Sequence, residues 1–288
     1  PPEVVAGDPW AYRLRTQLNV APGPAEAPAV GYFQRGSHDL VPVDRCPILV
    51  PELEELLPGL PALLGRASSG GEGRRGPPRR LDLAAGDRST VTAAPVVEGL
   101  PHGAVSATVG DFTYAFDARS FFQAHRGLLE RLVAAVLGVS PDPAAETAYD
   151  LYCGVGLFAL PLARRYRQVV AVDGDRVAVR YARRNARHNG LQNVLVEGVR
   201  VESWIQELPE GAARVVVDPP RSGLHRRVVQ TLLERFPDRI TYVSCHVATL
   251  ARDLRHLTES YDVERVTLFD LFPQSGHMEA VVQLVRSG

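Results

Sequence analysis

Strand-like and helix-like patterns of hydrophobic residues alternate along the C-terminal half of the chain. After Pro143, short apolar runs are separated by amphipathic stretches of helical period. The predicted strands are Thr147–Tyr152, Gln168–Val172, Asn193–Glu197, Arg214–Val217, Arg239–Ser244, Val263–Phe269 and Met278–Val285. The predicted helices are Leu157–Arg165, Arg176–Asn189, Arg226–Arg235 and Thr249–Thr258. This alternation predicts a doubly wound, seven-stranded and mostly parallel α/β sheet. The short connection 270–277 suits a hairpin, so we expect the last strand to be antiparallel.

The N-terminal part has a different pattern. From about Trp10 to Val97 the chain reads as short strands broken by Pro and Gly, and Tyr12–Val20 alternates with period two. A strand near Asp111–Phe116 and a helix over Gln123–Leu137 follow. We therefore predict a smaller β-rich domain over residues 1–117 and a Rossmann-like α/β domain over residues 118–288.

Composition narrows the class of protein. The chain has 288 residues, 45% of them hydrophobic, and a formal net charge of -1. No apolar run approaches the roughly 18 residues of a membrane span, so we expect no membrane contact. Three widely spaced cysteines do not form a disulfide framework and fit a reducing cytoplasm. We expect a cytoplasmic monomer.

All 32 basic residues are arginine, a bias that a GC-rich genome explains. Local arginine patches can still bind RNA phosphate. Two candidates are the Gly/Pro/Arg-rich segment Arg66–Arg80, which is otherwise a solvated hairpin tip, and the arginine face Arg183–Arg187 of a predicted helix.

A glycine-rich turn follows the first strand of the α/β region. In Asp150-Leu-Tyr-Cys-Gly-Val-Gly-Leu-Phe158, Gly154 and Gly156 allow the backbone to approach a ligand closely. Asp173 lies about twenty residues further on, at the end of the next strand, where a carboxylate can bind ribose hydroxyls. The pattern predicts a nucleotide-type site but does not separate NAD from S-adenosylmethionine.

Three further side chains are expected at the same edge of the sheet. Asp218 follows one predicted strand in Asp-Pro-Pro-Arg221, and Cys245 follows the next in Val-Ser-Cys-His246. Glu279 opens the last strand, and a carboxylate entering an apolar strand is costly unless it is functional or paired. The structural alternatives are a capped turn for Asp218, a buried small hydrophobic residue for Cys245 and a surface ion pair for Glu279. A thiol nucleophile and a carboxylate base are the functional reading.

Five segments together resemble the RNA uridine-5 methyltransferase family. They are Ser120-Phe-Phe-Gln-Ala-His125, the Asp150 turn, Asp218-Pro-Pro-Arg-Ser-Gly-Leu224, Val243-Ser-Cys-His-Val-Ala-Thr-Leu-Ala-Arg-Asp253 and Phe272-Pro-Gln-Ser-Gly-His-Met-Glu279. The resemblance covers the whole chain. It implies a class I methyltransferase fold, S-adenosylmethionine as cofactor and an rRNA or tRNA uridine as substrate. It also implies a covalent Cys–C6 adduct, with Cys245 as nucleophile and Glu279 as base. The implied cofactor residues are Gln123, Tyr152, Gly154, Leu157, Asp173 and Asp218, of which Leu157 offers only backbone or packing.

The chain departs from the family pattern in several places. The usual Ser-Cys-Asn-Pro is Ser244-Cys-His-Val247, the usual Gln-x-Asn is Gln123-Ala-His125, and no adenine-contacting side chain is evident at Gly198–Arg200. Many members also carry an N-terminal oligonucleotide-binding barrel and a Cys-rich iron–sulfur segment. Cys46 resembles the last ligand of a [4Fe-4S] cluster, so we expect either that the other ligands have been removed, which we favour, or that Cys46 is structural.

Two alternatives from other classes stay open. A nicotinamide-dependent oxidoreductase fits the glycine turn but not Asp218 with Cys245. A non-catalytic RNA-binding protein with a degenerate site accommodates the departures at His246 and Val199.

Overall fold

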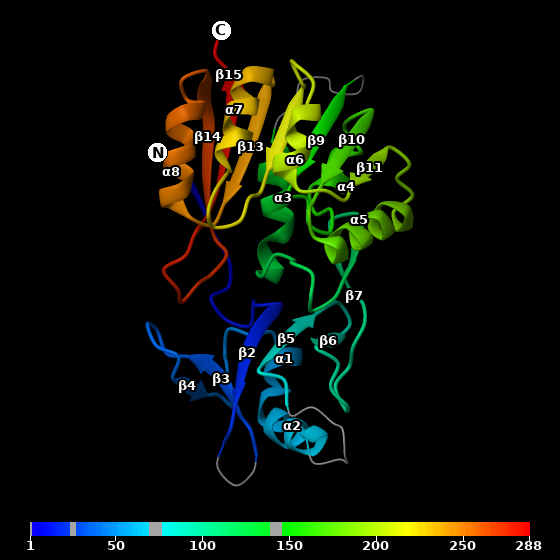
Figure 1. Ribbon diagram of the computed structural model, residues 1–288, viewed down its shortest axis with the longest axis vertical. Coiled ribbons are helices and arrows are strands. Elements are labelled where there is room, and N and C mark those ends of the chain that lie inside the picture. The colour runs from blue at the N-terminus through cyan, green and yellow to red at the C-terminus, as the bar shows by residue number, and fades with distance from the viewer. Residues whose placement is uncertain (1, 24–26, 69–76, 139–145) are drawn as a thin grey trace. The chain divides into compact units, whose positions relative to one another are not determined.

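The computed structural model describes residues 2–23, 27–68, 77–138 and 146–288. The chain forms two compact units (Figure 1). The first contains residues 1–7, 108–114 and 127–288, and the second contains residues 8–107 and 115–126. Most of the Arg66–Arg80 segment, including Arg74 and Arg75, lies outside the described residues. Within those residues, no helix is both long and apolar enough to cross a bilayer.

The first unit is built on an eight-stranded sheet. Its strands are β1 (Glu3–Ala6), β9 (Thr147–Leu151), β10 (Gln168–Val172), β11 (Val194–Glu197), β12 (Arg214–Val217), β13 (Arg239–Ser244), β14 (Tyr261–Asp270) and β15 (Glu279–Arg286). They lie in the order β1-β14-β15-β13-β12-β9-β10-β11. Only β15 is antiparallel to its neighbours, β13 and β14. The α/β class and the antiparallel last strand are therefore confirmed.

The eighth strand was not predicted. β1 pairs in parallel with β14, from Glu3 opposite Thr267 to Ala6 opposite Asp270. Four residues are too few for a hydrophobic period to show, and Val4 remains 62% exposed at this sheet edge. The N-terminal residues therefore belong to the α/β unit, which differs from the division at residue 117.

Helices cover both faces of this sheet (Figure 1). One face packs against α6 (Val201–Trp204), α7 (Arg226–Arg235) and α8 (Val247–Leu257) through a large apolar cluster. The other packs against α3 (Leu129–Leu137), α4 (Ala159–Leu162) and α5 (Arg176–His188). This second face also buries polar groups: the Arg214 guanidinium donates to Val136 O and Thr241 Oγ1, both at 2.7 Å. The two-sided burial explains the continuous apolar runs of β10 and β12.

The second unit contains a five-stranded antiparallel sheet in the order β4-β3-β2-β5-β6. The strands are β2 (Arg15–Ala21), β3 (Ala29–Phe33), β4 (Leu40–Pro42), β5 (Arg80–Ala85) and β6 (Val91–Ala94). The hairpin of β7 (Val105–Val109) and β8 (Phe112–Phe116) contributes residues to both units.

The second unit also contains helices, where the sequence was read only as short strands. They are α1 (Pro51–Glu54), the 3-10 turn η2 (Leu57–Gly59) and α2 (Leu60–Ser68). Leu53, Leu57, Leu60 and Leu64 are buried at helical spacing. Prolines obscured this pattern, although Pro51 stands at a helix start, where proline is tolerated.

The helix expected over Gln123–Leu137 begins later, as a 3-10 turn η3 (Arg126–Leu128) followed by α3. His125 instead bridges to Arg13, and the Leu14 amide donates to the Ala124 carbonyl at 2.8 Å. These tertiary hydrogen bonds hold residues 123–125 in an extended conformation, so Gln123 is not helical.

Candidate active site

Four of the predicted site residues follow strand ends at one edge of the first unit's sheet. Tyr152, Asp173, Asp218 and Cys245 come directly after β9, β10, β12 and β13, which are parallel. Glu279 opens β15, which runs in the opposite direction, so it reaches the same edge. The carboxyl edge of a doubly wound sheet is where such folds bind ligands.

The glycine turn is held by Asp173. One carboxylate oxygen of Asp173 accepts the Gly154 amide at 2.8 Å, and the other accepts the Asp175 amide at 2.7 Å. Tyr152, Gly154 and Gly156 all have left-handed backbone conformations, with φ of 64°, 54° and 93°. A Cβ built on Gly154 meets no atom within 4 Å, whereas one on Gly156 would come 2.9 Å from Leu160. Gly154 therefore leaves open space above the turn, and Gly156 permits close packing below it.

Asp150 is a buried acidic residue near this edge of the sheet to which the sequence pattern assigns no role. Its side chain is fully buried near the end of β9, and a hydrogen bond with the backbone of Ala159 partly offsets the cost of that burial. Burial and then the Asp218 carboxylate raise the pKa of Asp150 well above its ordinary range, which favours its protonated form.

Cys245 and Glu279 occupy neighbouring places in the β13–β15 ladder. Ser244 pairs with Ala280, so Cys245 follows the last paired residue of β13 and Glu279 precedes its partner on β15. Glu279 is only 2% exposed, whereas Cys245 is half-buried. The thiol is thus accessible and the carboxyl group beside it is withdrawn from water.

Electrostatics couple these two groups. Burial and then the Asp218 carboxylate raise the pKa of Glu279 well above its ordinary range, against an opposing effect of Arg221. Burial and then Glu279 raise the pKa of the Cys245 thiol, while the Arg221 guanidinium, which hydrogen-bonds the thiol, lowers it. Shifts of this kind are typical of sites that move protons.

The N-terminal turns of α8 hold the segment Asp218–Leu224 in place. Asp253 is buried and accepts the Leu224 amide at 2.8 Å and the Tyr242 hydroxyl at 2.6 Å. The Thr249 hydroxyl donates to the Arg221 carbonyl at 3.1 Å, and the Arg252 guanidinium donates to the Ser222 carbonyl at 3.0 Å. The segment that bears Asp218 and Arg221 is therefore tied to the helix that follows Cys245.

Two histidines lie near the thiol and the carboxylate in sequence. His246 caps α8, because its Nδ1 accepts the Thr249 amide at 3.3 Å. The imidazole therefore caps α8 at the position where the family pattern has asparagine. His277 is exposed and stacks edge-on against Phe272.

Leu157 is buried, and its carbonyl accepts the Tyr114 hydroxyl at 3.1 Å, in keeping with a backbone and packing role. Glu202, in the first turn of α6, accepts the Tyr152 hydroxyl at 3.2 Å. Glu202 is an acidic side chain shortly after β11. It was not predicted as a site residue because it lies just beyond Gly198–Arg200.

Gln123 belongs to the second unit, so its cofactor role stays a prediction from the resemblance. In the same segment Phe122 is buried and stacks on Phe116, whereas Phe121 is 59% exposed under the Arg15 guanidinium. The pattern could have revealed this, since one of two adjacent aromatic residues in an extended segment faces outward. Exposed aromatic rings are platforms on which RNA bases stack.

Cys46 also lies in the second unit, where its thiol accepts a long hydrogen bond of 3.7 Å from the Tyr32 hydroxyl. Throughout the described part of the chain, no group of three or more His, Cys, Asp or Glu side chains could hold a metal ion.

Known proteins provide an independent comparison. A sequence profile described as tRNA (Uracil-5-)-methyltransferase matches residues 102–211 and 210–287. The 23S rRNA (uracil(1939)-C(5))-methyltransferase RlmD of Salmonella choleraesuis is 34% identical over 99% of this chain and 73% of its own length. RlmD of an Enterobacter species is 36% identical over 97% of this chain and 72% of its own length.

A solved structure agrees with these sequence relatives. The tRNA (uracil-54, C5)-methyltransferase of Pyrococcus abyssi, in complex with S-adenosyl-L-homocysteine, superposes with a TM-score of 0.78 and 25% identity. The superposition covers 99% of this chain and 79% of the archaeal one.

Proposed function

The chain belongs to the tRNA (uracil-5-)-methyltransferase family, and from this premise we propose that it methylates carbon 5 of one uridine in a structured RNA through a covalent adduct with Cys245. The observation that carries the proposal is the neighbouring placement of the Cys245 thiol and the buried Glu279 carboxyl group in one β ladder. Family membership disfavours the nicotinamide-dependent alternative.

The described residues fit S-adenosylmethionine. The open space over Gly154 can receive its nucleoside, and Asp173 keeps lone pairs for ribose hydroxyls after accepting two backbone amides. Tyr152 and Asp218 complete the unit's proposed cofactor set. When bound, the cofactor supplies an electrophilic methyl group on a sulfonium.

Uracil C5 is a weak nucleophile, and Cys245 activates it. The thiolate sulfur adds to C6, and the electron pair of the C5–C6 double bond moves towards the O4 carbonyl, so that C5 becomes enolate-like. With the cofactor held by the residues of this unit, C5 would take up its methyl group, and the cofactor would leave as a neutral thioether.

Glu279 completes the reaction as the base. Its carboxylate takes the proton from C5, the C5–C6 double bond re-forms, and the bond between C6 and Cys245 breaks to free the thiolate. Its raised pKa makes Glu279 a stronger base than an exposed carboxylate. Arg221, which hydrogen-bonds the thiol, stabilises Cys245 as the anion that attacks and later leaves.

The target uridine must leave its stack to reach this edge, so a loop uridine is the expected substrate. The relatives named for position 1939 of 23S rRNA share 33–36% identity with this chain, and the solved tRNA-directed enzyme shares 25%. This difference favours rRNA over tRNA.

An iron–sulfur cluster does not fit the residues present. A [4Fe-4S] cluster takes four thiolates, and this chain has three cysteines, of which Cys153 and Cys245 belong to the other unit from Cys46. No step of the proposed reaction uses a metal.

The function is tested by supplying methyl-labelled S-adenosylmethionine with 23S rRNA and, separately, with tRNA, both transcribed without modification. Nucleoside analysis should find labelled 5-methyluridine in one of them, with rRNA expected. A protein that binds RNA but labels no uridine would instead support the non-catalytic alternative.

A further inference from the structure

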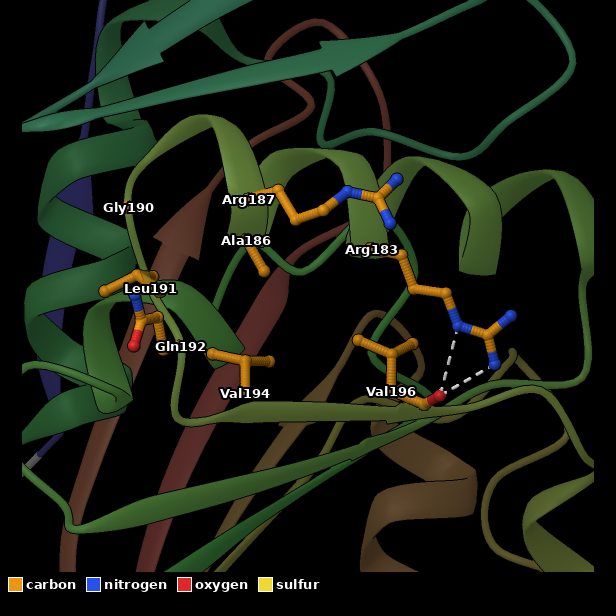
Figure 2. Close-up of a pocket in the computed structure, with 8 residues that line it drawn as sticks. All are labelled: Arg183, Ala186, Arg187, Gly190, Leu191, Gln192, Val194 and Val196. Atoms are coloured by element: carbon orange, nitrogen blue, oxygen red, sulfur yellow. Dashed lines mark hydrogen bonds between the residues drawn. The ribbon is translucent and has the colours of Figure 1, made fainter.

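A pocket of about 420 Å³ lies between α5 and the edge strand β11, apart from the residues of the active site. Figure 2 shows Arg183 at one end of the pocket and Leu191 and Gln192 at the other. Ala186 lies on its helix side, and Val194 and Val196 lie on its strand side. Its volume falls within the roughly 300–1,000 Å³ of small-molecule sites, and its lining combines apolar side chains with two arginines and a glutamine.

The helix that forms one wall is strongly basic. α5 has 13 residues, including five arginines and no acidic residue, in a protein whose net charge is -1. The arginines are Arg176, Arg180, Arg183, Arg184 and Arg187. Within the described ranges, none of the five forms a salt bridge with a carboxylate, whereas Arg239 and Arg252 elsewhere in the unit do. The positive charge of this face is therefore available to an anionic partner.

The two pocket arginines differ in their contacts. The Arg183 guanidinium donates through Nε and Nη2 to the Val196 carbonyl, at 3.3 and 2.8 Å, so its plane is fixed at one end of the pocket. Figure 2 shows the Arg187 side chain extended along the outside of α5. An extended guanidinium is suited to bidentate phosphate binding.

We propose that this pocket binds one unpaired nucleotide of the substrate RNA, with the base between Ala186 and Val194 and the phosphate on Arg187. The Arg183 guanidinium borders the edge of the base at one end of the pocket, and the Gln192 amide bonds its polar edge at the other. This inference rests on the proposed function, which makes RNA the anionic partner. RNA modules commonly bind such splayed nucleotides through stacking and arginine contacts.

The pocket's position decides what the nucleotide does. β11 begins at Val194, and α5 ends at His188, so the end of the pocket with Leu191 and Gln192 lies at the amino edge of the sheet, while the Arg183 end reaches Val196. The proposed catalytic groups lie at the carboxyl edge. The pocket nucleotide is therefore distant from the methylated uridine, and it contributes to RNA affinity and register rather than to the chemical step.

The first test separates affinity from chemistry. Arg187→Gln should raise KM for a long RNA substrate on the order of tenfold and reduce the salt slope by about 1, with kcat within about twofold of the parent. Arg227→Gln, an exposed arginine on α7, is the matched control and should change neither. A parent that methylates RNA, with an unchanged KM in Arg187→Gln, would overturn the pocket but not the proposed function. If the parent protein methylates no RNA, the proposed function itself is refuted, and the pocket proposal, which rests on it, is refuted with it.

The second test locates the base directly. RNA containing 4-thiouridine is photo-crosslinked to the protein, which is then digested with trypsin. In the parent, the peptide His188–Arg200 contains Leu191, Gln192, Val194 and Val196, and it should carry a crosslink. Arg187→Gln lacks the cleavage site before His188, so the same residues appear in the peptide Asn185–Arg200, whose crosslink should be weaker. Arg183→Gln would also remove the hydrogen bonds from Arg183 to the Val196 carbonyl on β11. Gln192→Ala leaves those bonds in place, so it is the variant that tests contact with the base alone. Crosslinks confined to other peptides would mean that α5 contacts only phosphate or another acidic partner.

Discussion

The carboxyl group of Glu279 acts directly on the thiol of Cys245: after burial, it is the strongest influence that raises the thiol's pKa. The relationship follows from the ladder that pairs Ser244 with Ala280. Burial and Glu279 thus oppose Arg221, whose guanidinium hydrogen-bonds the same thiol and lowers its pKa.

The first prediction concerns this pKa. Glu279→Gln removes a negative charge beside Cys245, so the pH midpoint of Cys245 alkylation by iodoacetamide should fall. Arg221→Gln removes the stabilising cation, so the midpoint should rise. Mass spectrometry of the labelled peptide gives the rate for Cys245 separately from those of Cys46 and Cys153. Identical midpoints in all three proteins would refute the coupling.

The pH dependence of methylation has the same origin. The pKa values of Cys245 and Glu279 are both raised, and each group acts in its deprotonated form. The rate of 5-methyluridine release, which needs both groups, should therefore increase with pH through the neutral range and continue to increase on the alkaline side. A rate that is highest in acid and falls with rising pH would contradict these roles.

The third prediction concerns the cofactor. Asp173→Ala should weaken S-adenosylmethionine binding by about 1.5–3 kcal/mol, because charge-assisted hydrogen bonds to ribose are lost. Isothermal titration measures the effect. Asp262→Ala, an exposed carboxylate on β14, is the control and should bind as the parent does. Equal affinity in the two variants would remove Asp173 from the site.

The fourth prediction concerns the tie between α8 and the Asp218 segment. Gly223 has φ of 76°, and a Cβ there would come 2.6 Å from an Asp253 carboxylate oxygen. Gly223→Ala should therefore displace Asp218 and Arg221 and reduce kcat by at least about tenfold, on the usual scale for a misplaced catalytic group. Gly211→Ala, at another left-handed glycine with open space around it, controls for backbone strain and should retain activity.

Much of the first unit could be predicted from its sequence because several of its strands are followed directly by a residue whose side chain can bind a ligand or react. Asp173, Asp218 and Cys245 end buried apolar runs, and the parallel topology brings such ends to one edge. The antiparallel direction of β15 was predictable from the shortness of the preceding connection, and it places Glu279 beside Cys245.

The features that could not be predicted depend on contacts between distant residues. β1 is a strand only because β14 offers a free edge, and residues 123–125 are extended because Arg13 and Leu14 bond to them. The roles of Asp253 and Arg221 depend on contacts between α8, β13 and the Asp218 segment, which are distant from one another in the sequence. Predicting the pocket beside β11 would require knowing which strand lies at the edge of the sheet.

The most direct test of covalent catalysis uses Glu279→Gln with methyl-labelled S-adenosylmethionine and unmodified RNA, analysed on a denaturing gel. Addition and methyl transfer should proceed while removal of the C5 proton stalls, so labelled methyl should accumulate in a denaturation-resistant band of protein and RNA. Cys245→Ala should form no such band and no 5-methyluridine. If Glu279→Gln turns over at the parent's rate, another base such as His246 or His277 does the work. If Cys245→Ala still methylates uridine, the covalent mechanism itself is contradicted.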